Sequence, residues 1–307
     1  MNSQSRISIF SLAVISIFII SCQSNQGNVE LNGEIASDKK QSTLNPEEEE
    51  IKDAVKKLLF AAGNYNIEVL DEMVSDKAMI GYSFLSDGKW TNREMTIHEY
   101  FENAKNRDLR PFSEIPTNFD IIVTEGRLAL VRADSILYRM GVARNREINH
   151  FTLMKEGENW NFLNISWTAY RLPEEKRKFD LDIFAHSYAQ AWCSKRPEFV
   201  ASYFAETGSL QVNDGDPAKG RDAISKIAQS FMTKFPDMIV SFDSLSHKPN
   251  GIEFYWTLTG TDADPDGKGN KVNVSGFELW TMTEDGQIKD SQGSFPTEEY
   301  EKQLNME

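Results

Sequence analysis

The chain of 307 residues has little cysteine, little histidine and too little positive charge to balance its acidic groups. It contains two cysteines and four scattered histidines, and 33 basic residues face 47 acidic ones, for a net charge of −14. Two cysteines exclude a disulfide-built scaffold, and the histidines show no metal-ligand spacing. An acidic chain without a long basic stretch repels phosphate groups, which excludes nucleic acid as a partner.

Cofactor motifs are also missing from the sequence. There is no phosphate-binding Gly-x-x-x-x-Gly-Lys loop, no dinucleotide fingerprint and no Gly-x-Ser-x-Gly elbow. Residues 262–267 have the opening spacing of a calcium loop, but its twelfth position is Asn273 instead of the glutamate that calcium requires. We therefore expect no cofactor and no bound metal.

One hydrophobic run stands at the start of the chain. Ile7 to Ile20 follows a lone positive charge and is too short for a comfortable membrane span. The run ends in Ile-Ile-Ser-Cys, which resembles the bacterial lipobox, with Cys22 as the lipidated residue. The resemblance implies a lipoprotein signal over residues 1–22. Acyl chains on Cys22 would hold the protein at a membrane of the bacterial cell envelope, either in the periplasm or exposed at the surface.

Two structured units are expected after a polar tether over residues 23–45, which is too poor in apolar residues to fold. The first unit, residues 46–173, opens on Pro46 and four glutamates, a helix start followed by apolar residues at helical spacing. Strand-like runs follow this helical part. The second unit, residues 179–305, repeats the order of helices first and then antiparallel strands. Aligning Phe151 with Phe277 suggests a duplicated α+β unit whose helices cover a curved sheet.

This order of elements resembles the NTF2-like fold, a cone of helices and bent sheet around an apolar pocket. In the second unit the resemblance narrows to the SnoaL-like branch, which includes polyketide cyclases. The segments that carry it are "GRDAI" from Gly220, "FPD" from Phe235, "WTLTGT" from Trp256, "VSGFELW" from Val274 and "DGQI" from Asp285. The first unit resembles the general NTF2-like group through "LALVRAD" from Leu128 and "FTLMKEGENWNF" from Phe151.

The resemblance implies a pocket more directly than it implies catalysis. Catalytic SnoaL-like proteins carry an aspartate in the closing segment, seven residues before a Gln-Leu pair, and here that position is Pro296. The Gly-Thr-His that is frequent in the family reads Gly260-Thr261-Asp262. Both departures favour a ligand pocket without the expected catalyst.

Two carboxylates are candidates to replace the missing aspartate. Strand alternation places Asp290 on one face with Ser294, and if that face points inward, Asp290 could act as a general base. Glu278 alternates with Trp280 and could face the same cavity. A hydrogen-bonded or solvated strand carboxylate is the alternative for both residues.

Several other residues are candidates for lining a pocket. In the second unit they are Ser294 and the aromatic residues Tyr188, Trp192, Trp256 and Trp280. The aromatic residues are equally suited to a plain core. In the first unit they are Asp134, His150 and Trp167, with a structural role as the alternative for His150.

Three functions are compatible with these features. The first is a lipid-anchored protein that binds a small apolar molecule without catalysis. The second is a SnoaL-like cyclase, isomerase or hydratase that uses Asp290 or Glu278. The third is a protein-interaction platform, although the two units could pair with each other as a pseudo-dimer. We favour the first, because the expected catalytic aspartate is missing.

Overall fold

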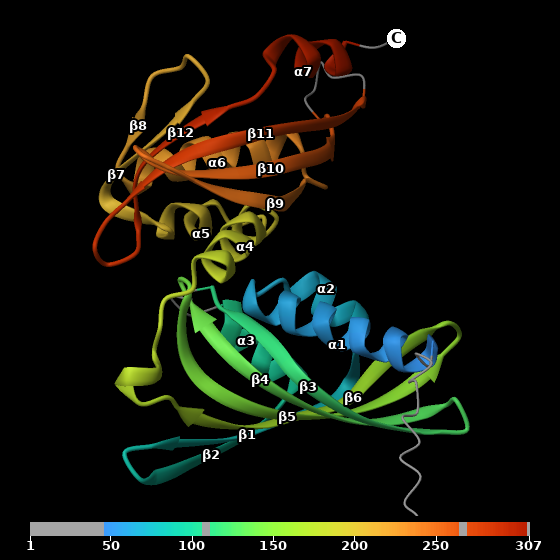
Figure 1. The fold of residues 1–307 in the computed structure, drawn as a ribbon. Helices are drawn as coiled ribbons and strands as arrows, with labels where there is room; N and C mark the ends of the chain where they lie inside the picture. The colour runs from blue at the N-terminus through green and yellow to red at the C-terminus, as the bar shows by residue number, and fades with distance from the viewer. Residues whose placement is uncertain (1–45, 106–110, 264–268, 306–307) are drawn as a thin grey trace, which may run out of the picture. The chain divides into compact units, whose positions relative to one another are not determined.

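The computed structural model describes residues 46–105, 111–263 and 269–305 (Figure 1). The predicted signal segment, Cys22 and the tether lie outside the described residues. Within the described ranges, no helix has the length and apolar character needed to cross a membrane.

The first unit, here called the first cone, consists of three helices and a six-stranded sheet. Pro46 opens its first helix, acidic residues occupy the first turn, and Ile51, Val55 and Leu58 form the buried stripe. In chain order the elements are α1 (Pro46–Gly63), α2 (Ile67–Met73), β1 (Val74–Ser86), β2 (Lys89–Thr96), α3 (Ile97–Lys105), β3 (Ser113–Thr124), β4 (Leu128–Arg139), β5 (Val142–Glu156) and β6 (Asn159–Arg171).

The sheet of the first cone has the strand order β2-β1-β6-β5-β4-β3. Only the β1–β6 pair is parallel, and the remaining neighbours are antiparallel. The helices α1, α2 and α3 lie over one face of this bent sheet (Figure 1). The buried core of the cone, which includes Leu58, Ile80, Phe151 and Phe162, lies between these two layers.

The second unit, here called the second cone, repeats this arrangement after the short 3-10 helix η1 (Glu174–Lys176). Asp180 caps its first helix by accepting a hydrogen bond from the Ile183 backbone N–H. The elements are α4 (Leu181–Trp192), α5 (Pro197–Ser202), β7 (Phe204–Val212), β8 (Ala218–Lys219), α6 (Arg221–Lys234), β9 (Ile239–Lys248), β10 (Gly251–Thr261), β11 (Lys271–Met282), β12 (Ile288–Ser294) and α7 (Thr297–Leu304).

The second sheet has the order β8-β7-β12-β11-β10-β9, which matches the first sheet strand for strand, and its only parallel pair is again the equivalent one, β7–β12. The expected α+β class, with two tandem units that each pack helices on a curved sheet, is therefore confirmed.

The alignment of Phe151 with Phe277 is wrong. Both parallel ladders are irregular at the same place, between Val74 and Met79 in β1 and between Phe204 and Ser209 in β7. When the cross-strand pairs are followed outward from that point, Trp280 occupies the place of Phe151. The two strands are thus offset by three residues relative to the expected alignment. Phe277 points to the face opposite Trp280, because neighbouring side chains of a strand alternate.

Candidate ligand-binding site

The first cone encloses a cavity of about 250 Å³ between its helices and its sheet. Apolar side chains form most of the wall, among them Leu58 of α1, Ile97 of α3 and Ile80 of β1. This volume is close to the lower end of ligand pockets, which begin at roughly 300 Å³. The cavity therefore suits a small organic molecule.

A row of polar side chains from β5 interrupts this apolar wall. Asn145, Glu147 and Asn149 all line the cavity. They share one face of β5 with the buried core residues Phe151 and Leu153, because alternate residues of a strand point the same way. Glu147 and Asn149 are buried, with 4% and 3% of their surface exposed, and Asn145 is half-buried.

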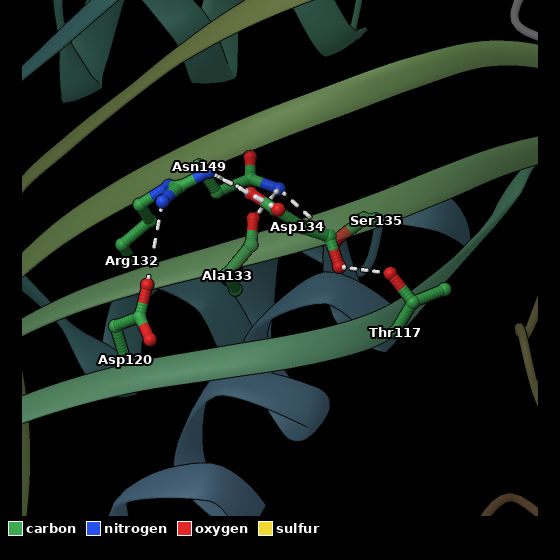
Figure 2. A network of polar contacts seen from close by, with 7 residues as sticks. All are labelled: Thr117, Asp120, Arg132, Ala133, Asp134, Ser135 and Asn149. Carbon is green, nitrogen blue, oxygen red and sulfur yellow. Dashed lines mark hydrogen bonds and ion pairs between the residues drawn. The ribbon is translucent and has the colours of Figure 1, made fainter.

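A second carboxyl group enters the cavity from β3. The side-chain amide of Asn149 donates hydrogen bonds to Glu114 Oε1 and, at 3.2 Å, to Ser135 Oγ. Figure 2 shows Asn149 reaching from β5 to Ala133 and Ser135 of the neighbouring strand. Asn145 Nδ2 donates to Glu147 Oε1 at 3.1 Å. Each carboxyl group is thus oriented by one asparagine.

Burial changes the protonation of both carboxyl groups. Desolvation raises the pKa of Glu147 to about 8, with a further increase from the nearby charge of Glu114, against a decrease from Asn145 and Arg139. Desolvation also raises the pKa of Glu114, although hydrogen bonds from Asn149 and Ser135 oppose the increase. At neutral pH, Glu147 therefore holds a proton in most molecules.

Aromatic side chains form the wall beside this polar row. Trp167 of β6 lies across from Asn149 and stacks on Tyr82 of β1, with ring centroids 4.8 Å apart and planes 16° apart. Tyr100 of α3 and Phe84 of β1 also line the cavity. Of the three candidates from the first unit, Trp167 is the one that the structure places in the cavity.

In the second cone, the buried carboxyl group of Glu278 is surrounded by donors. Glu278 Oε2 accepts hydrogen bonds from Ser291 Oγ at 2.6 Å, from Trp280 Nε1 at 2.9 Å and from the Tyr188 hydroxyl at 3.0 Å. Desolvation raises the pKa of Glu278, and the three donors oppose that increase. Desolvation, together with the charge of Glu278, raises the pKa of Tyr188 well above its usual value. This network ties α4 to β11 and β12 and resembles a structural core.

The space left inside the second cone is small. A cavity of about 50 Å³ touches Glu278, Trp192, Trp256 and Phe295. At roughly 30 Å³ per water molecule, it has room for one or two waters. Tyr188 and Trp280 are fully buried and belong to the core. Trp192 and Trp256 do reach the cavity, but too little of it remains for an organic ligand.

The difference in volume arises at equivalent positions of the two sheets. In the second cone Trp256 lies opposite Gly276, and a Cβ atom at Gly276 would come within 2.7 Å of the indole ring. The ladder positions occupied by this pair correspond in the first cone to Ser135 and Glu147, which lie opposite each other. A tryptophan over a glycine fills the second cone, whereas a serine beside a glutamate leaves the first cone open.

Asp290 and Ser294 do not face the interior. Ser291 reaches Glu278, so its neighbour Asp290 lies on the opposite face, where it accepts hydrogen bonds from Ser209 and Thr281. Ser294 lies on that same face and is exposed. The structure therefore does not bring Asp290 and Glu278 together, and the conditional placement of Asp290 inside the cone is wrong.

Asp134 and His150 also lie on the outer face of their sheet. Figure 2 shows Arg132 between Asp120 and Asp134, and the Arg132–Asp134 ion pair measures 2.9 Å. His150 is paired with Arg132 across the strands and is exposed. Neither candidate lines the cavity, because both alternate with the inward residues Ala133 and Asn149.

No cluster of histidine, cysteine, aspartate and glutamate among the described residues could hold a metal ion. The chemistry available in the first cone is instead that of two carboxyl groups, two amides and an aromatic wall. Such a set can orient a ligand, accept or release a proton, and balance a positive charge.

Comparison with known proteins gives one family match and a set of partial structural likenesses. A family model described as a SnoaL-like domain matches residues 185–291, within the second cone. No curated protein matches the chain.

Among solved structures, a candidate SnoaL-like polyketide cyclase from Jannaschia sp. CCS1 is 15% identical, with a TM-score of 0.33, over 36% of this chain and 79% of that chain. A phenazine biosynthesis-related protein from Pseudomonas aeruginosa is 14% identical, with a TM-score of 0.33, over 43% and 89%. An NTF2-like protein of unknown function from Exiguobacterium sp. 255-15 is 19% identical, with a TM-score of 0.32, over 36% and 94%.

The carboxyl pair of the first cone was not among the sequence-based candidates, although a signal for it exists. Phe151 and Leu153 are expected in the core, and counting back by twos from Phe151 gives Asn149, Glu147 and Asn145. His150 alternates with these residues, so it is not expected on the inward face of the strand. Glu114 has no comparable signal, because β3 begins before Pro116, earlier than its apolar run indicates.

Proposed function

We propose that the first cone binds a small, largely apolar molecule that carries a polar group, and that the protein does so without turning it over. The observation that carries this proposal is the 250 Å³ cavity, whose mainly apolar wall also contains Glu114, Arg139, Glu147 and the two asparagines. Apolar contact supplies affinity at about 0.8 kcal/mol per buried methylene, and a few placed polar groups supply orientation.

Binding without turnover is supported by the fate of the residues from which catalysis was expected. Pro296 occupies the place of the family's closing aspartate, and Asp290 lies on the outer face of the second sheet. Glu278 is engaged by three donors beside a space of about 50 Å³. A SnoaL-like reaction that uses either carboxylate has little room for a substrate.

We further propose that lipid on Cys22 holds the protein at the bacterial cell envelope, on the periplasmic side or at the surface. The support is the lipobox-like sequence Ile19 to Cys22 after an apolar run. Replacement of Cys22 by serine is expected to move the chain from the membrane fraction to the soluble fraction after cell lysis. A wild-type chain that is already soluble would contradict the anchor.

Binding is tested by native mass spectrometry of the full chain released from membranes in detergent. We expect the wild type to carry a co-purified molecule other than lipid or detergent. Ser135→Trp, which introduces the bulk found at the equivalent position of the second cone, should lose it. Asp134→Asn changes the adjacent residue on the outer face and should keep it. An empty wild type, or equal occupancy in Ser135→Trp, would overturn the proposal.

A further inference from the structure

We propose that the ligand of the first cone is a monovalent organic cation, an amine or a quaternary ammonium, whose charged end lies against Glu114 and Glu147. This inference rests on the proposed function and adds the chemical class of the ligand. It is carried by the charges and the aromatic side chains that face the cavity.

The charged groups that line the cavity do not cancel. They are Glu114 of β3, Glu147 of β5 and Arg139 at the end of β4; the titratable side chains Tyr82 and Tyr100 also face it. The lining residues of α1 and α2 carry no charge. When both carboxyl groups are ionised, one guanidinium leaves one negative charge unbalanced in the cavity. Either a proton or one bound cation can neutralise it.

The aromatic wall beside the carboxyl groups suits the rest of such a ligand. Trp167, Tyr82 and Tyr100 present aromatic rings to the same cavity. Cations are attracted to the faces of such rings, and quaternary ammonium groups are commonly held in aromatic cages. A neutral apolar ligand would use the rings but would leave the carboxyl pair without a function.

The two asparagines fix the carboxyl groups in place. Asn145 donates to Glu147 Oε1, and Asn149 donates to Glu114 Oε1. Each amide carbonyl oxygen is a further acceptor for an N–H group of a protonated amine. Both asparagines lie on one face of β5, and their hydrogen bonds hold the two carboxyl groups in position before a ligand binds.

Binding of a cation must displace the proton that Glu147 holds. The O–H bond of the Glu147 carboxyl group breaks, the proton goes to solvent, and the cation takes its place beside the carboxylate. Because burial raises the pKa of Glu147 to about 8, affinity for a permanent cation should increase with pH up to about 8 and then level off.

The test compares two probes of nearly equal shape on the full chain in detergent. Phenyltrimethylammonium carries a permanent charge, and tert-butylbenzene is its neutral counterpart. Isothermal titration should show the cation binding about tenfold more tightly for each pH unit between 6 and 8, with about one proton released, read from two buffers of different ionisation enthalpy. The neutral probe should bind with a pH-independent affinity.

Glu147→Gln should lose the pH dependence and bind the cation at least tenfold more weakly, while keeping its affinity for tert-butylbenzene. Asp134→Asn is the matched control and should behave as the wild type. Circular dichroism checks the fold of each variant, and the pH dependence of the wild type tests the inference even if Glu147→Gln does not fold.

The outcomes separate this inference from the proposed function. If only tert-butylbenzene binds, or if both probes bind without a pH dependence, the cation inference is overturned and the binding function stands. If neither probe binds, both are overturned. Cation binding with release of about one proton supports both.

Discussion

The two cones of this chain share one strand order but differ in what their interiors hold. The second cone, which contains the SnoaL-like match, is packed around Glu278 and its three donors and leaves about 50 Å³. The first cone lies outside the matched residues 185–291 and has a cavity of about 250 Å³, lined by Glu114 and by the buried Glu147. Resemblance to a family of pocket proteins therefore does not show where the pocket is.

The comparison indicates that a few side chains determine whether the interior of a cone is filled. Ser135 and Glu147 of the first sheet correspond in place to Trp256 and Gly276 of the second. The strand order is the same in both sheets. We therefore expect the bulk of this cross-strand pair to contribute to whether the interior of a cone is filled, because protein interiors are packed as densely as crystals.

The largest effect is expected from removing the carboxyl group at the centre of the second cone. Glu278→Ala leaves the Tyr188 hydroxyl, the Trp280 indole N–H and the Ser291 hydroxyl buried without their acceptor. We expect a loss of about 4 kcal/mol in the free energy of unfolding, measured by urea denaturation.

Glu278→Gln is the control for this change, since it keeps one acceptor oxygen and the volume of the side chain. It should cost clearly less than the alanine variant. Equal losses for the two variants would show that volume, and not the hydrogen-bond network, holds this core together.

A slightly smaller effect is expected from opening the second cone. Trp256→Ala removes the ring that lies over Gly276, and the cavity that results should cost about 3 kcal/mol in stability. The variant should also gain affinity for a small apolar probe such as benzene, measured by titration calorimetry against the wild type. If the variant gains no binding, the interior has collapsed and Trp256 does not by itself keep the second cone closed.

The stability of the first cone should depend on pH through Glu147. The pKa of Glu147 is about 8 in the folded chain and lower in the unfolded chain, so the stabilising contribution is complete below about pH 4.5 and is lost as pH rises through 8. Relative to the wild type, Glu147→Gln should therefore become more stable with rising pH, by on the order of 2 kcal/mol at pH 6 compared with the difference below pH 4.5. Thermal denaturation of both proteins between pH 4 and 9 measures this difference in stability. A stability difference between variant and wild type that stays constant with pH would contradict the raised pKa of Glu147.

The smallest effect is expected at Asp290. Its carboxylate accepts from Ser209 and Thr281 on the outer face of the second sheet, and an asparagine retains one acceptor oxygen. Asp290→Asn should cost about 0.5–1 kcal/mol and leave ligand affinity within about twofold of the wild type. A tenfold loss of binding would place Asp290 in the site after all.

The architecture of the chain could be read from its sequence, but the site could be read only in part. Helix starts such as Pro46, and the repeated order of helices and strands, predict two α+β cones. The inward faces follow from the alternation of side chains along a strand. Phe151 and Leu153 mark the face of β5 on which Glu147 and Asn149 also lie. The alternation of side chains cannot be followed across an irregular strand pair such as β11–β12. The sequence therefore did not show to which face of the sheet the Asp290 side chain points.

Cavity volume lies beyond this kind of reasoning, because it depends on pairs that are distant in the sequence. Ser135 and Glu147 lie opposite each other only after β4 and β5 have paired, and Glu114 joins them from a third strand. The sequence signals a hollow cone in both halves. Only the packed side chains show which half is open.

The central claim, an open first cone and a filled second cone, is tested most directly by crystallography of the protein grown with tert-butylbenzene. We predict density for the probe between Trp167 and Glu147 and none beside Trp256. Density beside Trp256, or an interior of the first cone that is filled by its own side chains, would contradict the claim.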